Sequence, residues 1–338
     1  METLAIISGA VIGVAILMYV VLDGFDLGVG ILFPFAPDEG ARDTMINSVA
    51  PVWDGNETWL ILGGGGLLVF FPVAYSIALP AFYIPVMAML FALIFRGVTF
   101  EFRHQAHTST HLWNRSFFWG SLIAAFMQGV LLGALVQGVE VEGVRYAGGM
   151  FDWLTPFSIL TGIGVVVGYG LLGATWLIYK TEGQVQDWAR SSATVLGGGT
   201  LIAMAAVSVM TPLLRPAIAD RWFGGINILY LSPIPLLTLT LAVSLFWSIF
   251  SKRELLPFLS SIGLFVLGFS GIAISLYPNI IPPSVAVWDA VAPRSSVIFA
   301  LVGVAVVLPM VLLYTVYAYS VFHGKASEHG GYAHHDHE

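Results

Sequence analysis

The sequence predicts an all-α, polytopic membrane protein that crosses the bilayer about nine times. Of its 338 residues, 57% are hydrophobic and only 10% are charged, whereas soluble domains contain about 25% charged residues. The apolar residues also form long windows, and a helix needs about 20 such residues to cross a bilayer core. Lipid is therefore the expected surrounding of most of the chain.

Nine apolar windows have the required length. The first has no basic segment before it and no small-residue cleavage site, so we expect a retained helix rather than a signal peptide. This helix should continue toward Pro34, and most connections between windows are short. In chain order the windows are 4–22, 49–71, 77–95, 116–138, 157–179, 192–214, 229–250, 257–277 and 296–320.

Positive charges lie mostly on one side of the predicted helices. Cytoplasmic loops retain Lys and Arg during insertion, whereas Asp and Glu have little influence. We therefore expect the N-terminus outside and the C-terminus in the cytoplasm, which fits an odd number of crossings. The richer side holds Arg42, Arg96, Arg103, Arg115, Lys180, Arg190, Lys252, Arg253 and Lys325, and the other side holds Arg145, Arg215, Arg221 and Arg294.

Composition excludes several classes of function. A net charge of −7, with no basic patch, argues against a nucleic-acid partner. The chain contains no cysteine, which excludes disulfides, thiolate metal sites and a cysteine nucleophile. Residues 1–322 form the predicted transmembrane domain, and 323–338 are expected to be a disordered, His-rich cytoplasmic tail. Clustered imidazoles can bind a transition metal, but a solvated tail is the favoured interpretation.

Two acidic stretches interrupt the apolar windows, at 23–30 and 51–59. Ionisable groups in a membrane segment cost about 2.5–3.5 kcal/mol each, so they persist chiefly where they face a protein interior. Asp23 and Asp26 are three residues apart and share a helix face, while Asp54 and Glu57 begin the next helix. Because the two helices run in opposite directions, both stretches should lie at the same cytoplasmic depth and can meet.

Carboxylates crowded in a low dielectric cannot all ionise cheaply, so such groups exchange protons near neutral pH. We favour a proton path for Asp26 and Asp54, with Trp53 and Asn56 as supporting residues. For Asp23 and Glu57 the alternative stays open that they cap helix ends or pair with an arginine. The candidate partners are Arg42, Arg96 and Arg103.

Other polar residues near the membrane surfaces are less diagnostic. The sequence predicts an interfacial ion-pair cluster at the inner end of the third helix, formed by Arg96, Glu101 and Arg103. A functional role and a purely structural role are equally favoured for this cluster. Trp288 and Asp289 lie on the outer side, where a tryptophan is typical of the aromatic belt and an aspartate can cap a helix.

Glycines and potential haem ligands complete the candidates. Gly63–Gly66, and Gly129 with Gly133, predict close approach between helices. Every histidine lies in a predicted cytoplasmic segment, and buried methionines are usually core residues. We therefore predict no haem ligand, no other bound cofactor and no metal site in this chain.

Several motifs carry a resemblance to a known family. They are LDGFDLGVG at 22–30, MINSVAPVWDGNETWLI at 45–61, LIFRGVTFEFR at 93–103, SVAVWDA at 284–290 and VLLYTVYAY at 311–319. In this order the chain resembles subunit II of cytochrome bd-type quinol oxidases over nearly its whole length. The wording FPFAPDEGARD and NETW is closer to the cyanide-insensitive branch.

The resemblance implies a complex in the bacterial cytoplasmic (inner) membrane that oxidises quinol and reduces dioxygen to water in aerobic respiration. Haems b and d would be held by subunit I, and this chain, not catalytic alone, would be its scaffold partner. The family fold is two four-helix bundles plus one peripheral helix. The acidic residues matching Asp26 and Asp54 are associated in the family with proton delivery from the cytoplasm. Some members hold a structural quinone, and a small accessory subunit is a further expected partner.

Two other functions remain open from the residues. A secondary transporter also has buried carboxylates and Gly-broken helices, but its charged motifs usually lie near the midplane in corresponding halves. Here the second half has no counterpart. The other alternative is a purely structural assembly subunit whose acids do not conduct protons.

Overall fold

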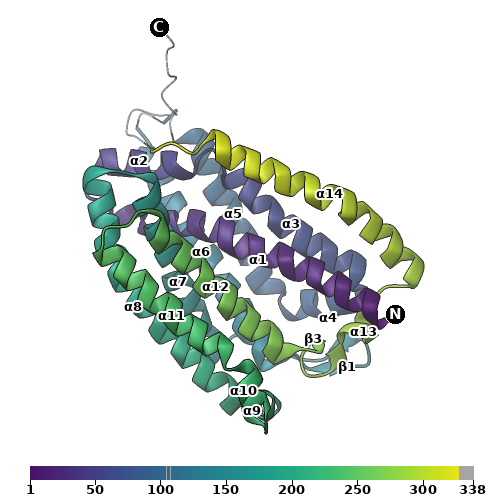
Figure 1. Ribbon diagram of the computed structural model, residues 1–338. Helices are drawn as coiled ribbons and strands as arrows, with labels where there is room; N and C mark the ends of the chain where they lie inside the picture. The colour runs from purple at the N-terminus through teal and green to yellow at the C-terminus, as the bar shows by residue number, and fades with distance from the viewer. Residues whose placement is uncertain (104, 107, 327–338) are drawn as a thin grey trace.

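The computed structural model describes residues 1–103, 105, 106 and 108–326, and nearly all of them are helical (Figure 1). In chain order the elements are α1 (Glu2–Leu32), the 3-10 turn η1 (Phe33–Phe35), α2 (Glu39–Val49), α3 (Trp53–Phe70), α4 (Pro72–Ala81), α5 (Tyr83–Phe102), α6 (Thr110–Gln137), β1 (Val141–Glu142), β2 (Arg145–Tyr146), α7 (Pro156–Lys180), α8 (Gly183–Leu214), α9 (Pro216–Phe223), α10 (Asn227–Leu231), α11 (Pro233–Phe250), α12 (Leu255–Leu276), β3 (Asn279–Ile281), β4 (Val285–Ala286), α13 (Val287–Ala290) and α14 (Arg294–Val321).

Eight helical segments within the described residues are long and apolar enough to cross a membrane. The remaining predicted window, 49–71, corresponds to α3, whose 18 residues pack along α1. Asp54 and Glu57 lie near the start of α3, and Asn56 lies between them, so only the later part of this helix is continuously apolar. As expected, α1 continues past the first window and ends at Leu32.

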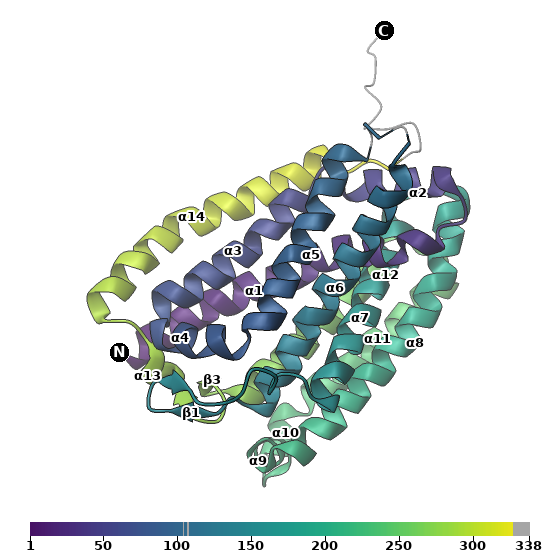
Figure 2. The same ribbon diagram turned by 180° about the vertical axis from the view of Figure 1, so that it is seen from behind.

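The helices form two bundles and one peripheral helix (Figures 1 and 2). The first bundle contains α1, α3, α5 and α6, and the second contains α7, α8, α11 and α12. Helix α14 lies along the outside against α3 and α1, and only Val297 among its residues is buried. The predicted all-helical membrane architecture is therefore confirmed.

Glycines allow the two bundles to touch. A Cβ atom on Gly28 of α1 would overlap the backbone carbonyl oxygen of Tyr169 in α7, and one on Gly173 would overlap the backbone of Gly28. The α6–α7 contact is similar, since a Cβ on Gly129 would lie 2.5 Å from the Thr161 carbonyl oxygen. These backbone contacts confirm the predicted close approach. By contrast, Gly64 has open space around it.

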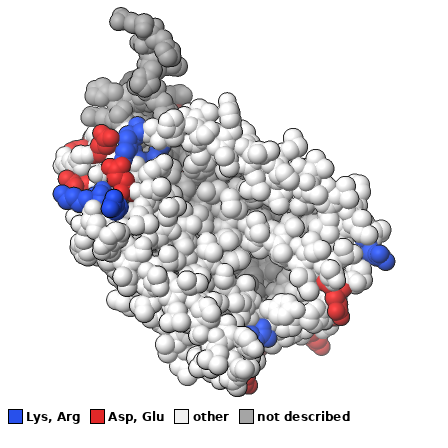
Figure 3. Space-filling model, viewed as in Figure 1, with Lys and Arg blue, Asp and Glu red and all other residues white. Residues whose placement is uncertain are grey.

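Charged side chains gather mainly near the end of the molecule where α14 ends, and a few lie at the opposite end, whereas the broad middle is uncharged (Figure 3). The more charged end contains the starts of α3, α6, α8 and α12 and the ends of α5, α7, α11 and α14. It therefore carries the richer set of Lys and Arg, and we call it the inner end.

The short polar helices and turns contain no long apolar window, so the apolar pattern does not predict them. Helix α2 lies at the inner end and begins where the Asp38 carboxylate accepts a hydrogen bond from the Ala41 backbone N–H, at 2.7 Å. The short α9 and α10 and the two hairpins, β1–β2 and β3–β4, occupy the opposite end (Figure 2).

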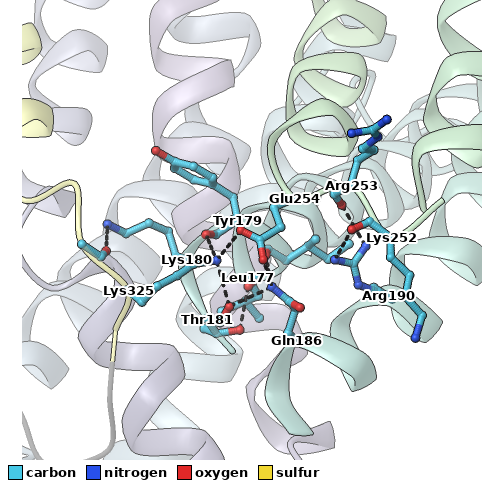
Figure 4. A network of polar contacts seen from close by, with 12 residues as sticks. Leu177, Tyr179, Lys180, Thr181, Gln186, Arg190, Lys252, Arg253, Glu254 and Lys325 are labelled. Atoms are coloured by element: carbon cyan, nitrogen blue, oxygen red, sulfur yellow. Dashed lines mark hydrogen bonds and ion pairs between the residues drawn. The ribbon is translucent and has the colours of Figure 1, made fainter. Parts of the chain in front are cut away.

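The residues after α14 are held against the end of α7 by a group of contacts that we call the C-terminal clamp (Figure 4). Lys180 donates to the carbonyl oxygens of Phe322 and Gly324, each at 2.6 Å. Lys325 donates to the Tyr179 carbonyl oxygen at 2.8 Å and pairs with Glu254 at 2.9 Å. The first residues of the predicted tail are thus bound to the end of α7. Residues 327–338, which include His329, His334, His335 and His337, lie outside the described residues.

Candidate functional site

A fully buried ion pair joins α1 to α5. One guanidinium nitrogen of Arg96 lies 2.5 Å from an Asp23 carboxylate oxygen, and neither side chain is exposed. A second guanidinium nitrogen of Arg96 lies 3.9 Å from Glu57, whose side chain is 25% exposed. The Trp53 ring lies beneath the guanidinium at 5.7 Å. Of the alternatives for Asp23, pairing with an arginine is the one observed, and the arginine is Arg96.

Asp26 lies one helical turn further along α1 and is also fully buried. The Asn56 amide nitrogen donates to the Asp26 Oδ2 atom at 2.8 Å. The Tyr319 hydroxyl of α14 in turn donates to the Asn56 Oδ1 atom at 2.9 Å. Three helices therefore meet around this carboxyl group.

The start of α3 is positioned by aromatic packing. Trp53 stacks on Phe100 of α5 with ring centroids 4.7 Å apart and an angle of 10° between the planes. A Cβ on Gly97 would lie 3.2 Å from the Trp53 ring, so glycine leaves room for the indole on α5. This packing places Asn56 and Glu57 beside the two aspartates of α1.

The buried charges do not balance. Two carboxyl groups, Asp23 and Asp26, share one guanidinium, that of Arg96, and all three side chains are excluded from solvent. Leaving a buried carboxylate uncompensated is expensive, so the low-dielectric site favours a proton on one of the two. One oxygen of each carboxyl group, Asp23 Oδ2 and Asp26 Oδ1, has no hydrogen-bond partner within the described part of the chain. We call Asp23, Asp26, Asn56, Glu57 and Arg96 the acid cluster.

Asp54 lies at the rim of the acid cluster rather than inside it. Asp54 is exposed in the first turn of α3. Glu57 is intermediate between the exposed Asp54 and the buried aspartates of α1. Its side chain is partly exposed, and its carboxylate lies 3.9 Å from the Arg96 guanidinium. The structure thus orders the acids from the surface to the interior as Asp54, Glu57 and then the aspartates of α1.

The other predicted site residues lie apart. Glu101 is exposed at the end of α5. Arg103 instead pairs with Asp43 at 2.7 Å. The predicted ion-pair cluster of Arg96, Glu101 and Arg103 is therefore wrong, because α5 turns Arg96 into the interior. Trp288 and Asp289 are exposed in α13 at the end opposite the acid cluster.

Sequence reasoning missed four polar residues. The Gln128 amide donates to the Tyr19 hydroxyl at 2.8 Å, and the Tyr169 hydroxyl donates to the Gln128 carbonyl oxygen at 2.7 Å. This chain of hydrogen bonds links α1, α6 and α7 on the other side of Asp23. Tyr319 was missed although it ends the motif at 311–319, because isolated tyrosines and glutamines in apolar windows resemble ordinary membrane residues.

No group of three or more His, Cys, Asp or Glu residues that could hold a metal ion occurs within the described part of the chain. His111 lies in the first turn of α6 and His323 just after α14. His104 and His107 fall outside the described residues. Met45 and Met89 pack into the apolar core of the first bundle. The absence of a haem ligand remains a prediction.

Fold and site together define a polytopic helical membrane subunit with a buried, unbalanced acid cluster near one end. Residues 4–322 match the family described as cytochrome bd terminal oxidase subunit II, so the chain belongs to that family. It is 32% identical to cytochrome bd-I ubiquinol oxidase subunit 2 of Escherichia coli K12, over 97% of this chain and 96% of the relative. It is 31% identical to cytochrome bd ubiquinol oxidase subunit 2 of Bacillus subtilis 168, over 90% of this chain and 92% of the relative.

A solved structure supports the fold. The structure of bd oxidase from Geobacillus thermodenitrificans contains a chain that matches with a TM-score of 0.77. The match covers 95% of this chain and 97% of that chain, at 17% sequence identity. The two helical folds are thus alike over nearly their whole lengths.

Proposed function

We propose that this chain is the scaffold subunit of a bd-type quinol:oxygen oxidoreductase in the bacterial cytoplasmic membrane. Its partner is a haem-bearing subunit I, which holds haems b and d, and together they oxidise membrane quinol and reduce dioxygen to water. The names of the relatives support ubiquinol oxidase activity for the complex. A structural quinone and a small accessory subunit stay predictions from the family resemblance.

The chemical contribution we propose for this chain is proton uptake from the cytoplasm. The observation that carries it is the acid cluster, in which two fully buried carboxyl groups share one guanidinium. In this proposal Asp54 takes up protons at the surface and Glu57 passes them inward. Asp26 then holds a proton in the interior for transfer toward the partner subunit. The excess of Lys and Arg at the inner end supports a cytoplasmic C-terminus and an outside N-terminus.

The test replaces each acid by its amide in the assembled oxidase. Asp26→Asn keeps the shape but removes the titrating group, and we expect the oxygen-consumption rate to fall by about 10²-fold. Asp54→Asn should reduce it less, because water can reach that exposed position. Oxygen consumption and proton generation are measured together in proteoliposomes.

The matched control is Asp289→Asn, since Asp289 is an exposed carboxylate at the opposite end. It should leave both quantities unchanged. Unchanged oxygen consumption and unchanged proton generation in both Asp26→Asn and Asp54→Asn would overturn the proton-uptake proposal and favour a purely structural subunit.

A reduced-minus-oxidised spectrum of the purified complex addresses the other alternative. A co-purifying haem protein supports the oxidase, whereas its absence would favour a secondary transporter. The position of the charged residues argues against transport, because the acid cluster is confined to the first bundle and lies near the inner end rather than at the centre of both halves.

A further inference from the structure

We propose that Tyr319, on the peripheral helix α14, is a positioning residue that fixes the Asn56 amide and thereby decides which oxygen of Asp26 carries the exchangeable proton. The inference rests on the proposed proton uptake, because it assigns a proton within the same acid cluster. Tyr319 touches no reacting atom and acts only through Asn56.

The orientation of the Asn56 amide is determined by its neighbours on both sides. Its nitrogen lies 2.8 Å from Asp26 Oδ2 and 3.4 Å from the Leu22 carbonyl oxygen. An amide turned by 180° would place its own oxygen against the Leu22 carbonyl oxygen, which cannot donate. On the other side the Tyr319 hydroxyl supplies the donor that the amide oxygen needs, at 2.9 Å. The amide therefore presents N–H to Asp26.

This orientation differentiates the two oxygens of Asp26. Oδ2 accepts the N–H of Asn56, so a proton on the carboxyl group belongs on Oδ1. Oδ1 is buried and has no hydrogen-bond partner among the residues that the structure describes. A proton on Oδ1 is therefore held by no competing acceptor among these residues and is free to transfer. The same N–H stabilises the ionised carboxylate after the proton has left.

Tyr319 is itself held in place from two directions. Its ring packs edge-on against Trp176 of α7, with centroids 6.3 Å apart at 81°. A few residues later the C-terminal clamp fixes the backbone, where Lys180 binds the carbonyl oxygens of Phe322 and Gly324. The inner end of α14 is thus anchored, although the rest of this helix is largely exposed.

The test is Tyr319→Phe in the assembled oxidase, which keeps the ring against Trp176 and removes the hydroxyl. Without that donor, the buried Asn56 amide oxygen is unsatisfied and the amide is held on one side only. The bond from its N–H to ionised Asp26 is therefore weakened, which favours the protonated form of Asp26. We expect the alkaline limb of the oxygen-consumption pH profile to move up by about 0.5–1 pH unit, with a lower maximal rate. The infrared carbonyl band of the protonated carboxyl group should shift with it.

Tyr317→Phe is the matched control, since Tyr317 lies on the same helix with 66% of its surface exposed. It should leave the pH profile and the infrared band in place. Asn56→Leu provides a second variant: it should also move the alkaline limb upward, and adding Tyr319→Phe to it should cause no further shift.

The outcomes separate this inference from the function on which it rests. If Asp26→Asn lowers proton uptake but Tyr319→Phe leaves the pH profile and infrared band unchanged, the positioning role is overturned and proton uptake stands. An additional shift from Tyr319→Phe in the Asn56→Leu background also overturns it, because Tyr319 then acts by another route. If neither Asp26→Asn nor Asp54→Asn has an effect, the proposed proton uptake itself fails.

Discussion

The acid cluster and the C-terminal clamp use similar residue types in opposite ways. In the acid cluster, two buried carboxyl groups share one buried cation. Within residues 1–103, 105, 106 and 108–326, some polar atoms of Asp23, Asp26 and Arg96 have no hydrogen-bond partner. In the clamp, the cations Lys180 and Lys325 are surrounded mainly by backbone carbonyl oxygens. An unbalanced excess of buried carboxyl groups is suited to binding and releasing protons, whereas cations among carbonyl oxygens hold chain segments together.

The location of each region fits this difference. Carbonyl oxygens at the end of a helix are unsatisfied and attract cations, and the clamp lies where α7 and α14 both end. The acid cluster lies along the sides of α1 and α5 and at the start of α3. Its side chains bond chiefly to one another.

The largest effect is expected from Arg96→Leu. This variant leaves the buried carboxyl groups without their cation, which typically costs about 3–5 kcal/mol. We expect a clear loss of assembled complex and a lower thermal unfolding midpoint, both measured on the purified oxidase.

The double variant Asp23→Leu with Arg96→Leu sharpens this prediction. Removing both partners leaves no unpaired ion in that pair, so much of the stability should return. A double variant less stable than Arg96→Leu alone would contradict the assignment of Asp23 as the counter-ion.

A smaller effect is expected from Lys180→Met, which keeps much of the side-chain volume and removes the ammonium group of the clamp. The carbonyl oxygens of Phe322 and Gly324 lose a charged donor, which should weaken the docking of the C-terminal segment by about 1–3 kcal/mol. Limited proteolysis after α14 should become faster. Lys252→Met, at an exposed position at the same end, should not change the cleavage rate, and equal rates in both variants would contradict the clamp.

The smallest effect concerns pH. Hydrogen bonds from Lys325 and Gln186 hold the pKa of Glu254 below its ordinary value of 4.5. Because this pKa is lowered on folding, the stabilisation is present above pH 4.5 and is lost as the pH falls through the lowered value. Proteolysis after α14 should therefore accelerate at acidic pH. In Glu254→Gln the rate of proteolysis after α14 should no longer rise at acidic pH. If the rate still rises as it does in the unchanged protein, another group is responsible.

The sequence was sufficient to predict the membrane helices because long apolar segments have few ways to satisfy their backbone in lipid. Their division into two bundles and a peripheral helix was expected only from the family resemblance. The sequence also predicted that the acidic stretches of α1 and α3 meet. It did not predict that α5 turns Arg96 inward, away from Glu101, because a helix of this composition has no strongly polar face. The partnership of Asn56 with Tyr319 joins residues far apart in the chain, and no local pattern contains it.

The hydrogen bond from Tyr319 to Asn56 also has a consequence for biosynthesis. Membrane helices emerge from the ribosome in order, so α1 and α3 enter the bilayer long before α14 is made. Until that last helix arrives, the Asn56 amide oxygen lacks its donor. Helix α14 thus completes a site begun by α1, and a subunit truncated before Tyr319 would have both bundles but an unfinished acid cluster.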